Sequence, residues 1–248
     1  MKTSIITVTF NSANTLVDTF ASVRNQDYPL IEYIVVDGGS TDGTLDLIQE
    51  NSANISKWIS EPDSGLYDAM NKGIRMATGD VIGLINSDDF YIDDRVVSDV
   101  MAIFQRRAEL DAVHGELFYV DAENTDKVVR HWKTGEFTKG SFANGWHPAH
   151  PTLFLKRSVY EKYGSFNLDF KLAADFEFMC RIFEKHTINS AYLNRPLIKM
   201  RLGGATSKNL KNILAQNIEC YRAFTTNGVP VSPFYTLKRI LPKLKQYL

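Results

Sequence analysis

The sequence predicts an α/β protein whose central sheet is mostly parallel. Through residues 1–115, short β-rich runs alternate with amphipathic stretches of helical spacing, the pattern of parallel strands joined by crossover helices. Polar or glycine-rich turns follow these strands, where ligands of open α/β sheets bind. The chain has 248 residues, 44% of them hydrophobic, so it can form one large domain, although its length alone does not exclude two.

The elements of the first half are expected in a regular order. Each strand is a short apolar run, and each helix carries apolar positions three or four residues apart. The expected strands are 5–10, 32–36, 55–59 and 81–85, and the expected helices are 16–23, 44–50, 66–77 and 95–107. A further strand is expected at 112–115.

The second half gives weaker signals. Between 117 and 145, polar turns separate Phe118, Tyr119 and Trp132, so we expect a short antiparallel excursion or a mobile loop. Helical spacing returns at 176–183 and at 210–221.

Charge and composition exclude several classes of protein. The chain carries 28 basic and 29 acidic residues, a net charge of −1, so net charge provides no attraction to nucleic acid. Cys180 and Cys220 are too few for a disulfide framework or a structural zinc site, which favours a reducing cytoplasm. The apolar run 5–10 is too short for a signal peptide or a membrane span. We therefore expect a cytoplasmic protein that is soluble or attached only peripherally.

The first motif with chemical meaning is VVDGGSTDGT, residues 35–44. Its glycines let backbone N–H groups approach a ligand, and Asp37 at a strand end is placed to accept hydrogen bonds from a base or ribose. The alternative is a tight turn in which Thr41 or Asp42 caps the next helix. The motif lacks the G-x-G-x-x-G spacing, which disfavours a nicotinamide enzyme.

The second motif is LINSDD, residues 84–89, in which a buried strand ends in two carboxylates. Asp88 and Asp89 repel each other, and a divalent cation would relieve the repulsion. Mg²⁺ and Mn²⁺ suit such oxygen ligands and share the rest of their shell with water and substrate phosphates. The alternative is a solvated turn in which either aspartate caps the following helix.

The third motif is SEPDSGLYDAMNKG, residues 60–73. It places Asp63, Asp68 and Lys72 in a loop and the first helical turns, where a nucleotide phosphate could be received. Lys72 would neutralise phosphate as a point charge. The alternative is a solvent-facing lysine.

Asp175 opens an otherwise apolar helical face. Burial beside Phe176 and Phe178 would raise its proton affinity, which suits a general base. Glu177 is a rival for that role, and a helix N-cap is the structural alternative for Asp175.

His147 and His150 lie on either side of Pro148. Prolines prevent a regular helix from presenting both rings on one face, so a metal site made by the pair is disfavoured. A polar position in the wall of a site is favoured for His150.

The C-terminal stretch 234–248 carries Lys238, Arg239, Lys243 and Lys245 between apolar residues. This pattern is typical of a basic amphipathic element on an anionic lipid surface. The alternative is a tail packed on the domain, because Pro242 interrupts it.

Together, the strand 5–11 and the three motifs resemble glycosyltransferase family 2 in their order and spacing. SEPDSGLYDAMNKG, His150 and the string 200–204 are similar to the bacterial branch that assembles exopolysaccharide or O-antigen, colanic-acid enzymes included. The resemblance is strong over 4–95 and thinner from there to about 207. It implies a GT-A fold with a nucleotide-sugar-binding half (1–115), an acceptor-binding half of the same domain (116–207) and C-terminal helices (208–248).

The resemblance also implies roles on the donor side. Asn86-Ser87-Asp88 matches the family's Asp-x-Asp motif with Asn in the first position, so Asp88 becomes the favoured metal ligand and Asp89 a second or outer one. Asp37 matches the acid that contacts the base or ribose. The strand end at Val8, Phe10 and Asn11 matches the place where the base is held.

On the acceptor side, Asp175 matches the general base, with Ala174-Asp175 in place of the usual Glu-Asp pair. His150 matches a group on the acceptor or diphosphate side, and Arg201 matches a cation of a closing loop. These matches are looser than those of the donor side.

We therefore expect a Mg²⁺- or Mn²⁺-dependent inverting glycosyltransferase. Its donor would be a UDP, GDP or dTDP sugar, and its acceptor a glycan or a polyprenyl-diphosphate-linked oligosaccharide at the inner face of the plasma membrane. A sugar nucleotidyltransferase is the alternative enzyme, but it would need a glycine-rich basic loop where residues 10–14 carry neither glycine nor cation. A non-catalytic carbohydrate-binding protein is the second alternative.

Overall fold

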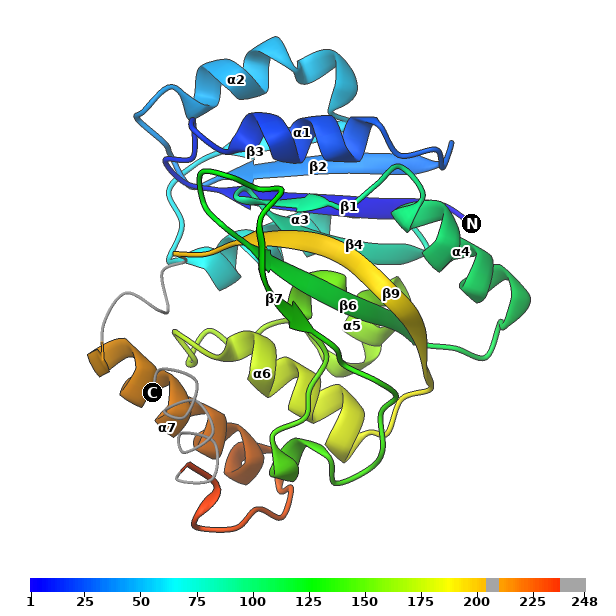
Figure 1. Cartoon of the computed structure of the whole chain (residues 1–248), viewed down its shortest axis with the longest axis vertical. Helices are drawn as coiled ribbons and strands as arrows, with labels where there is room; N and C mark the ends of the chain where they lie inside the picture. Colours follow the sequence, from blue (N-terminus) through cyan, green and yellow to red (C-terminus); the bar gives the residue numbers. More distant parts are fainter. Residues whose placement is uncertain (204–209, 237–248) are drawn as a thin grey trace.

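The computed structural model describes residues 1–203 and 210–236 (Figure 1). Nine strands form one curved sheet in the order β3-β2-β1-β4-β8-β6-β9-β5, and β7 pairs with β6 outside this path. Helices α1, α2 and α4 cover one face of the sheet, and α3, α5, α6 and α7 cover the other. The predicted α/β class is confirmed.

The first half of the chain forms the parallel part of the sheet, as predicted. The strands are β1 (Thr3–Thr9), β2 (Ile31–Asp37), β3 (Lys57–Ser60) and β4 (Val81–Asn86), and the helices are α1 (Leu16–Arg24), α2 (Thr44–Glu50), α3 (Leu66–Met76) and α4 (Val96–Arg106). Thr9 of β1 is in register with Asp37, and Val8 is in register with Asn86. The turns after β1, β2 and β4 therefore meet at one edge of the sheet.

The second half adds antiparallel pairs to the sheet. Its strands are β5 (Asp89–Tyr91), β6 (Ala112–Val120), β7 (Val128–Trp132), β8 (Phe154–Lys156) and β9 (Ser190–Arg201), and its helices are α5 (Arg157–Tyr163), α6 (Ala174–Met179), which continues as a π-helical segment (Cys180–Lys185), and α7 (Leu210–Asn227). The strand expected at 112–115 extends to Val120 and pairs antiparallel with β7. The antiparallel excursion is thus confirmed.

The long strand β9 was not predicted. Asn194, Arg195 and Pro196 interrupt its apolar pattern, and proline is rare inside a paired strand because it lacks an N–H donor. The structure accommodates Pro196 opposite Glu116, where the β6–β9 register shifts. β9 is stabilised by its parallel pairing with β6, a segment distant in the sequence, and no local sequence pattern predicts such a pairing.

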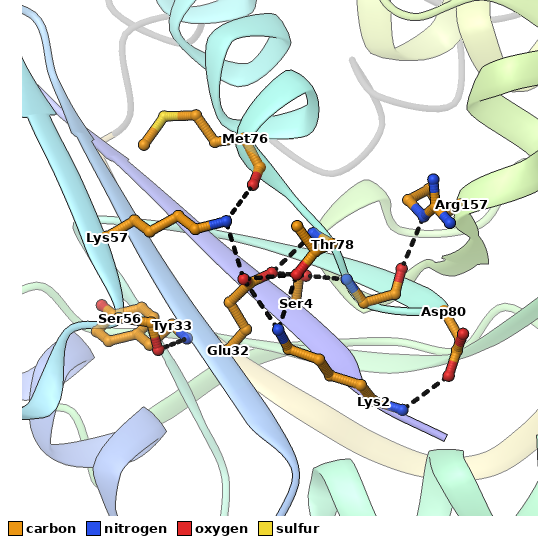
Figure 2. A network of polar contacts seen from close by, with 11 residues as sticks. Lys2, Ser4, Glu32, Tyr33, Ser56, Lys57, Met76, Thr78, Asp80 and Arg157 are labelled. Carbon is orange, nitrogen blue, oxygen red and sulfur yellow. Dashed lines mark hydrogen bonds and ion pairs between the residues drawn. The ribbon is translucent and has the colours of Figure 1, made fainter.

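The buried carboxylate of Glu32 lies near the amino ends of β1 and β2 (Figure 2). This is the end of the sheet opposite the edge where the turns after β1, β2 and β4 meet. The side chain of Glu32 is 4% exposed and forms ion pairs with Lys2 at 3.0 Å and Lys57 at 3.1 Å. Its carboxylate also accepts hydrogen bonds from Ser4 Oγ at 2.6 Å, Thr78 N at 2.8 Å and Thr78 Oγ1 at 2.7 Å. Burial alone would raise the pKa of Glu32, but these hydrogen bonds outweigh it and hold the pKa well below its ordinary value.

We expect Glu32→Gln to lower the free energy of unfolding at pH 7 by about 2 kcal/mol, because it removes charge-assisted hydrogen bonds at a buried position. A lowered folded-state pKa contributes stability that is present above the ordinary value of 4.5 and is lost as pH falls below it. The difference between wild type and variant should therefore shrink below about pH 4. Urea unfolding across pH measures this difference.

The matched control is Glu109→Gln, because Glu109 is 59% exposed and pairs with Arg107 at 3.0 Å on the surface. This substitution should change stability far less than Glu32→Gln. Equal effects of the two substitutions would contradict the account of Glu32.

Candidate active site

The carboxyl edge of the parallel strands gathers the predicted motifs. Asp37 at the end of β2 and Asn86 at the end of β4 lie on either side of β1, roughly 10 Å apart at the usual strand spacing. The hydroxyl groups of Ser12 and Ser87 are 2.8 Å apart and join the turns after β1 and β4. This edge is the natural ligand crevice of such a sheet.

Asp37 is the centre of the glycine turn. Its side chain is fully buried, and it accepts hydrogen bonds from Gly39 N at 3.1 Å, Ser40 N at 3.0 Å and Ser60 Oγ at 2.6 Å, and from the Ser40 hydroxyl. The carboxylate therefore shapes the turn from within. Its contact with a base or ribose stays a prediction.

An exposed aromatic ring and a glycine lie side by side at this turn. Phe10 is 60% exposed at the end of β1. A Cβ on Gly38 would lie 3.3 Å from the Phe10 ring and 2.4 Å from Asp63 Oδ2, so a larger residue at position 38 would have to displace Asp63. Phe10, Gly38 and Asp63 therefore lie together at the sheet edge, and the binding of a nucleobase there stays a prediction.

Two neighbouring residues play different parts. Asn11 has a φ of 50°, an uncommon value that is held because Asn11 Oδ1 accepts Thr41 N at 2.9 Å and Asn11 N donates to Ser40 Oγ at 2.8 Å. Val8 is 3% exposed and packs in the core, so its side chain lies beside the site without lining it.

The loop before α3 is held by its own charged groups. Asp63 Oδ1 accepts Gly65 N at 2.8 Å, and Asp68 Oδ2 accepts Ser64 N at 3.1 Å. Lys72 Nζ lies 2.9 Å from Glu61 Oε1 and donates to Pro62 O at 2.9 Å. Lys72 therefore stabilises this loop, and its contact with a phosphate stays a prediction.

The turn between β4 and β5 holds the two adjacent aspartates. Asp89 is fully buried, and its Oδ2 accepts Asn86 Nδ2 at 3.0 Å. Burial, and then the charge of Asp88, raise the pKa of Asp89, and burial also raises the pKa of Asp88. This arrangement of like charges is unfavourable on its own, and a cation bound beside the two aspartates would relieve the repulsion.

Arg201 at the end of β9 fixes this turn from the other side. It is 8% exposed, pairs with Asp18 of α1, and donates from Nη1 to the backbone oxygen of Asp88 at 2.7 Å. Its guanidinium lies 4.9 Å from the centre of the Phe90 ring. Arg201 therefore positions Asp88. Its expected role as the cation of a closing loop stays a prediction.

The oxygen atoms of the β4–β5 turn fit a divalent cation. Within residues 1–203 and 210–236, no group of three or more His, Cys, Asp and Glu side chains could hold a metal. Mg²⁺ and Mn²⁺ need only one or two carboxylates when phosphates complete their shell. Asp89 Oδ1 and Asn86 Oδ1 are buried without a hydrogen-bond partner beside Asp88, so the turn keeps oxygen atoms unsatisfied.

Asp175 lies in the first turn of α6 and contacts the first turn of α3. Tyr67 Oη donates to Asp175 Oδ1 at 2.8 Å. The residue that caps α6 is Ala173, and Glu219 of α7 accepts its backbone N–H at 2.9 Å. The alternative of Asp175 as an N-cap is therefore wrong.

Glu177 is held on another side of α6. It is 2% exposed, and its carboxylate is bound by Arg181 Nη2 at 3.0 Å and by Asn227 Nδ2 at 3.0 Å. This buried network ties α6 to α7 and removes Glu177 as a rival base. Asp175 is thus the acidic side chain of α6 that contacts α3, through Tyr67.

The two histidines face different neighbours. His150 packs against Phe166, with ring centres 6.0 Å apart, and its Nε2 is buried without a hydrogen-bond partner. Burial lowers the pKa of His150. Phe166 also packs against Tyr67, which donates to Asp175, so His150 lies on the Asp175 side of the site. His147 instead contacts Trp132 and Phe176.

Tyr67 has a positioning role that can be tested. Burial and Asp175 raise the pKa of its phenol, so Tyr67 stays protonated and donates to the carboxylate. We expect Tyr67→Phe to lower kcat about tenfold, since a hydrogen bond to a charged group is worth about 1.5–3 kcal/mol. Thermal stability and donor affinity should change much less, because the substitution removes a single hydroxyl that contacts Asp175.

The control is Tyr28→Phe, which removes a tyrosine hydroxyl that donates to Met1 O at 2.6 Å far from the site. Steady-state kinetics, donor titrations and thermal melts compare the two variants. A Tyr67→Phe enzyme that is slower only in proportion to a loss of stability or of donor affinity would mean that Tyr67 only packs.

Sequence reasoning missed several residues of this site. Ser40 and Ser60 complete the shell of Asp37, and Asp18 holds Arg201. Ser40 lies inside the glycine motif, so a search for side chains that could saturate a buried carboxylate would have found it. Asp18 carried no signal, because its partner is 183 residues away.

The model of Glycosyl transferase family 2 matches residues 4–164. The chain therefore belongs to this family and is a glycosyltransferase, which decides against both alternatives named above. An uncharacterized glycosyltransferase of Mycobacterium tuberculosis is 34% identical over 180 residues, 72% of this chain and 67% of that protein. A PGL/p-HBAD biosynthesis glycosyltransferase of Mycobacterium bovis is 28% identical over 194 residues, 77% of this chain and 73% of that protein.

Solved structures share the fold. TarS of S. aureus, solved with UDP-GlcNAc, gives a TM-score of 0.69 at 18% identity over 88% of this chain and 66% of that chain. A mannosyltransferase of Pyrobaculum calidifontis, solved with GDP-Man and Mn²⁺, gives 0.64 at 17% identity over 96% and 68%. The predicted GT-A fold is thus confirmed. None of the described helices is long and apolar enough to span a membrane.

Proposed function

We propose that this chain is a metal-dependent inverting glycosyltransferase of bacterial surface polysaccharide synthesis. The observation that carries the proposal is that the site holds two separate acidic groups, one at the β4–β5 turn and one on α6. The turn at Asp88, with its unsatisfied oxygens, lies at the sheet edge, and Asp175 of α6 reaches the same edge through Tyr67 at the start of α3, the helix that follows β3. A donor diphosphate and an acceptor hydroxyl need these two kinds of group.

The donor is a nucleotide sugar whose base lies on the surface bordered by Phe10, Gly38 and Asp63. This placement is supported by the exposed Phe10 ring and by the glycine next to it, where a Cβ would meet Asp63 and Phe10. Proteins of similar fold bind UDP-GlcNAc and GDP-Man. UDP and GDP sugars are therefore the first donors to test, and dTDP sugars are included.

Asp88 is the residue that would hold Mg²⁺ or Mn²⁺, with Asp89 behind it and Arg201 fixing its backbone. A bound cation would stabilise the charge of the departing diphosphate. Asp89 and Asn86 orient the turn, and they leave Asp88 as its outermost carboxylate.

Asp175 is the general base. It accepts the proton of the acceptor hydroxyl while that oxygen forms a bond to the anomeric carbon and the bond to the diphosphate oxygen breaks. One displacement inverts the configuration at that carbon. His150 lines the same side of the site, as its electrostatic contact with Asp175 supports.

The acceptor is a glycan or a polyprenyl-diphosphate-linked oligosaccharide, and the site of action is the cytoplasmic face of the membrane. This part rests on the resemblance of motif 60–73 to exopolysaccharide and O-antigen enzymes. Most of the basic stretch expected to contact lipid, residues 237–248, lies outside the described residues.

The test is titration of the full chain with UDP-, GDP- and dTDP-sugars, with Mn²⁺ or with EDTA, followed by assay of slow donor hydrolysis. We expect one donor to bind and to be hydrolysed only with the metal. Binding and hydrolysis that persist unchanged in EDTA would overturn the metal-dependent mechanism.

A further inference from the structure

A row of aromatic side chains runs beside the site from the β6–β7 hairpin to α6. Its members, which we call the aromatic row, are Tyr119, Trp132, His147 and Phe176. The rings of Tyr119 and Trp132 are parallel within 4° with centres 6.3 Å apart. Trp132 and His147 meet edge to face at 5.0 Å, and His147 and Phe176 do so at 5.4 Å. The four rings are thus in continuous contact.

The first end of the aromatic row lies near the metal-binding turn. Tyr119 of β6 and Asp89 of β5 both pair with Met200 of β9, from opposite sides. Residues paired across a sheet point to the same face, so Tyr119 and Asp89 share a face two strand spacings apart, roughly 10 Å. The Asp89 charge acts on Tyr119, which agrees with this placement.

The second end of the aromatic row lies on the helix that carries the base. Phe176 directly follows Asp175 in α6, and the two side chains leave the helix about 100° apart. The aromatic row therefore runs from the strand beside the metal-binding turn to the helix that carries Asp175.

The β6–β7 hairpin, which carries Tyr119 and Trp132 of the aromatic row, is braced on its opposite face. Glu116 and His131 lie on the opposite face of the β6–β7 pair, and Glu116 Oε2 is 2.5 Å from His131 Nε2. Tyr192 of β9 donates to the other oxygen of this buried carboxylate. A rigid support of this kind keeps a binding surface in one geometry.

The chemistry of the exposed part of the aromatic row suits a sugar. Tyr119 and Trp132 are half-buried, and the exposed Arg130 lies with its guanidinium 5.5 Å from the centre of the Tyr119 ring. A sugar ring presents C–H groups on its faces and hydroxyls at its edge. Flat aromatic faces can pack against the C–H groups, and a nearby polar donor such as Arg130 can hydrogen-bond the hydroxyls.

We propose that the aromatic row is the acceptor platform, on which a pyranose ring of the acceptor glycan stacks against Trp132 with a hydroxyl directed toward Asp175. This inference rests on the proposed function and names the part of the acceptor that the enzyme grips. In this proposal, the β6–β7 hairpin is the part of the enzyme that selects a carbohydrate acceptor over water.

The experiment compares Trp132→Ala and Trp132→Phe with Trp58→Ala, a control in which the tryptophan is 37% exposed on β3. The probes are octyl glycosides of glucose, galactose, mannose, rhamnose and N-acetylglucosamine. We expect Trp132→Ala to lower kcat/KM for the responsive glycoside about tenfold, near the upper end of an aromatic contact. Trp132→Phe should restore most of it, and donor hydrolysis without acceptor should stay as in wild type.

Donor hydrolysis separates the possible failures. A wild-type enzyme that hydrolyses no nucleotide sugar would overturn the proposed function itself. Intact donor hydrolysis would overturn the acceptor platform alone if no glycoside responded in wild type, or if Trp132→Ala lowered transfer no more than Trp58→Ala. If the Trp132→Ala protein fails to hydrolyse donor, Trp132→Phe and Arg130→Ala are tested in its place. The acceptor platform then requires that Arg130→Ala raise KM for the glycoside.

Discussion

Asp175→Asn should lower the rate of sugar transfer by about 10²–10⁴-fold, the usual contribution of general base catalysis. The asparagine keeps the shape of the side chain and can still accept from Tyr67, so thermal stability and donor affinity should change little. Initial rates with donor and a responsive acceptor, together with donor binding by calorimetry, measure both effects. A lower rate with unchanged stability and donor affinity is the pattern that the loss of one proton acceptor would produce.

Two comparisons make the result specific to Asp175. Asp169→Asn alters an exposed carboxylate just before α6 and should leave the rate unchanged. Glu177→Gln alters the buried partner of Arg181 and should lower stability rather than act on the chemistry. The assignment fails if Asp175→Asn keeps wild-type activity, or if Glu177→Gln loses activity at full stability.

Asp88→Asn should lower activity by about a thousandfold, because charge stabilisation of a leaving group is often the largest catalytic contribution. Donor binding in the presence of Mn²⁺ should fall toward the level seen in EDTA. Stability should hold or rise, since the substitution removes repulsion between Asp88 and the buried Asp89. Calorimetric donor titrations and thermal melts measure these opposite changes.

Asp94→Asn is the matched control, because Asp94 is an exposed aspartate shortly after the same turn. It should leave donor binding, metal dependence and activity at wild-type values. An Asp88→Asn enzyme that still binds donor more tightly with Mn²⁺ than with EDTA would remove Asp88 from the metal site.

The donor edge was predictable because its signals are local. Asp37, Asn86 and Asp88 each follow a short apolar strand, and parallel strands place such ends together. Periodicity alone located the four parallel strands and the helices between them. The role of Asp37 was not visible in the same way, because its saturation by Ser40 and Ser60 depends on how the turn folds back.

The acceptor half was less predictable because long-range pairing builds it. β9 contains a proline and charged residues, yet it is a long strand because β6 and β5 pair with it on both sides. Arg201 reaches Asp18 and Asp88 only through that pairing. Similarly, Trp132 and His147 carry no motif, and their contact arises from the packing of the β6–β7 hairpin against the segment before β8.

The central claim is that Asp88 and Asp175 face one donor from its two sides. The most direct test is a crystal structure of Asp175→Asn with Mn²⁺ and the donor found by titration. The account predicts the metal on Asp88, the base beside Phe10 and Gly38, and the side chain of residue 175 on the side of the anomeric carbon opposite the diphosphate. A diphosphate bound away from the β4–β5 turn, or residue 175 on the diphosphate side, would contradict it.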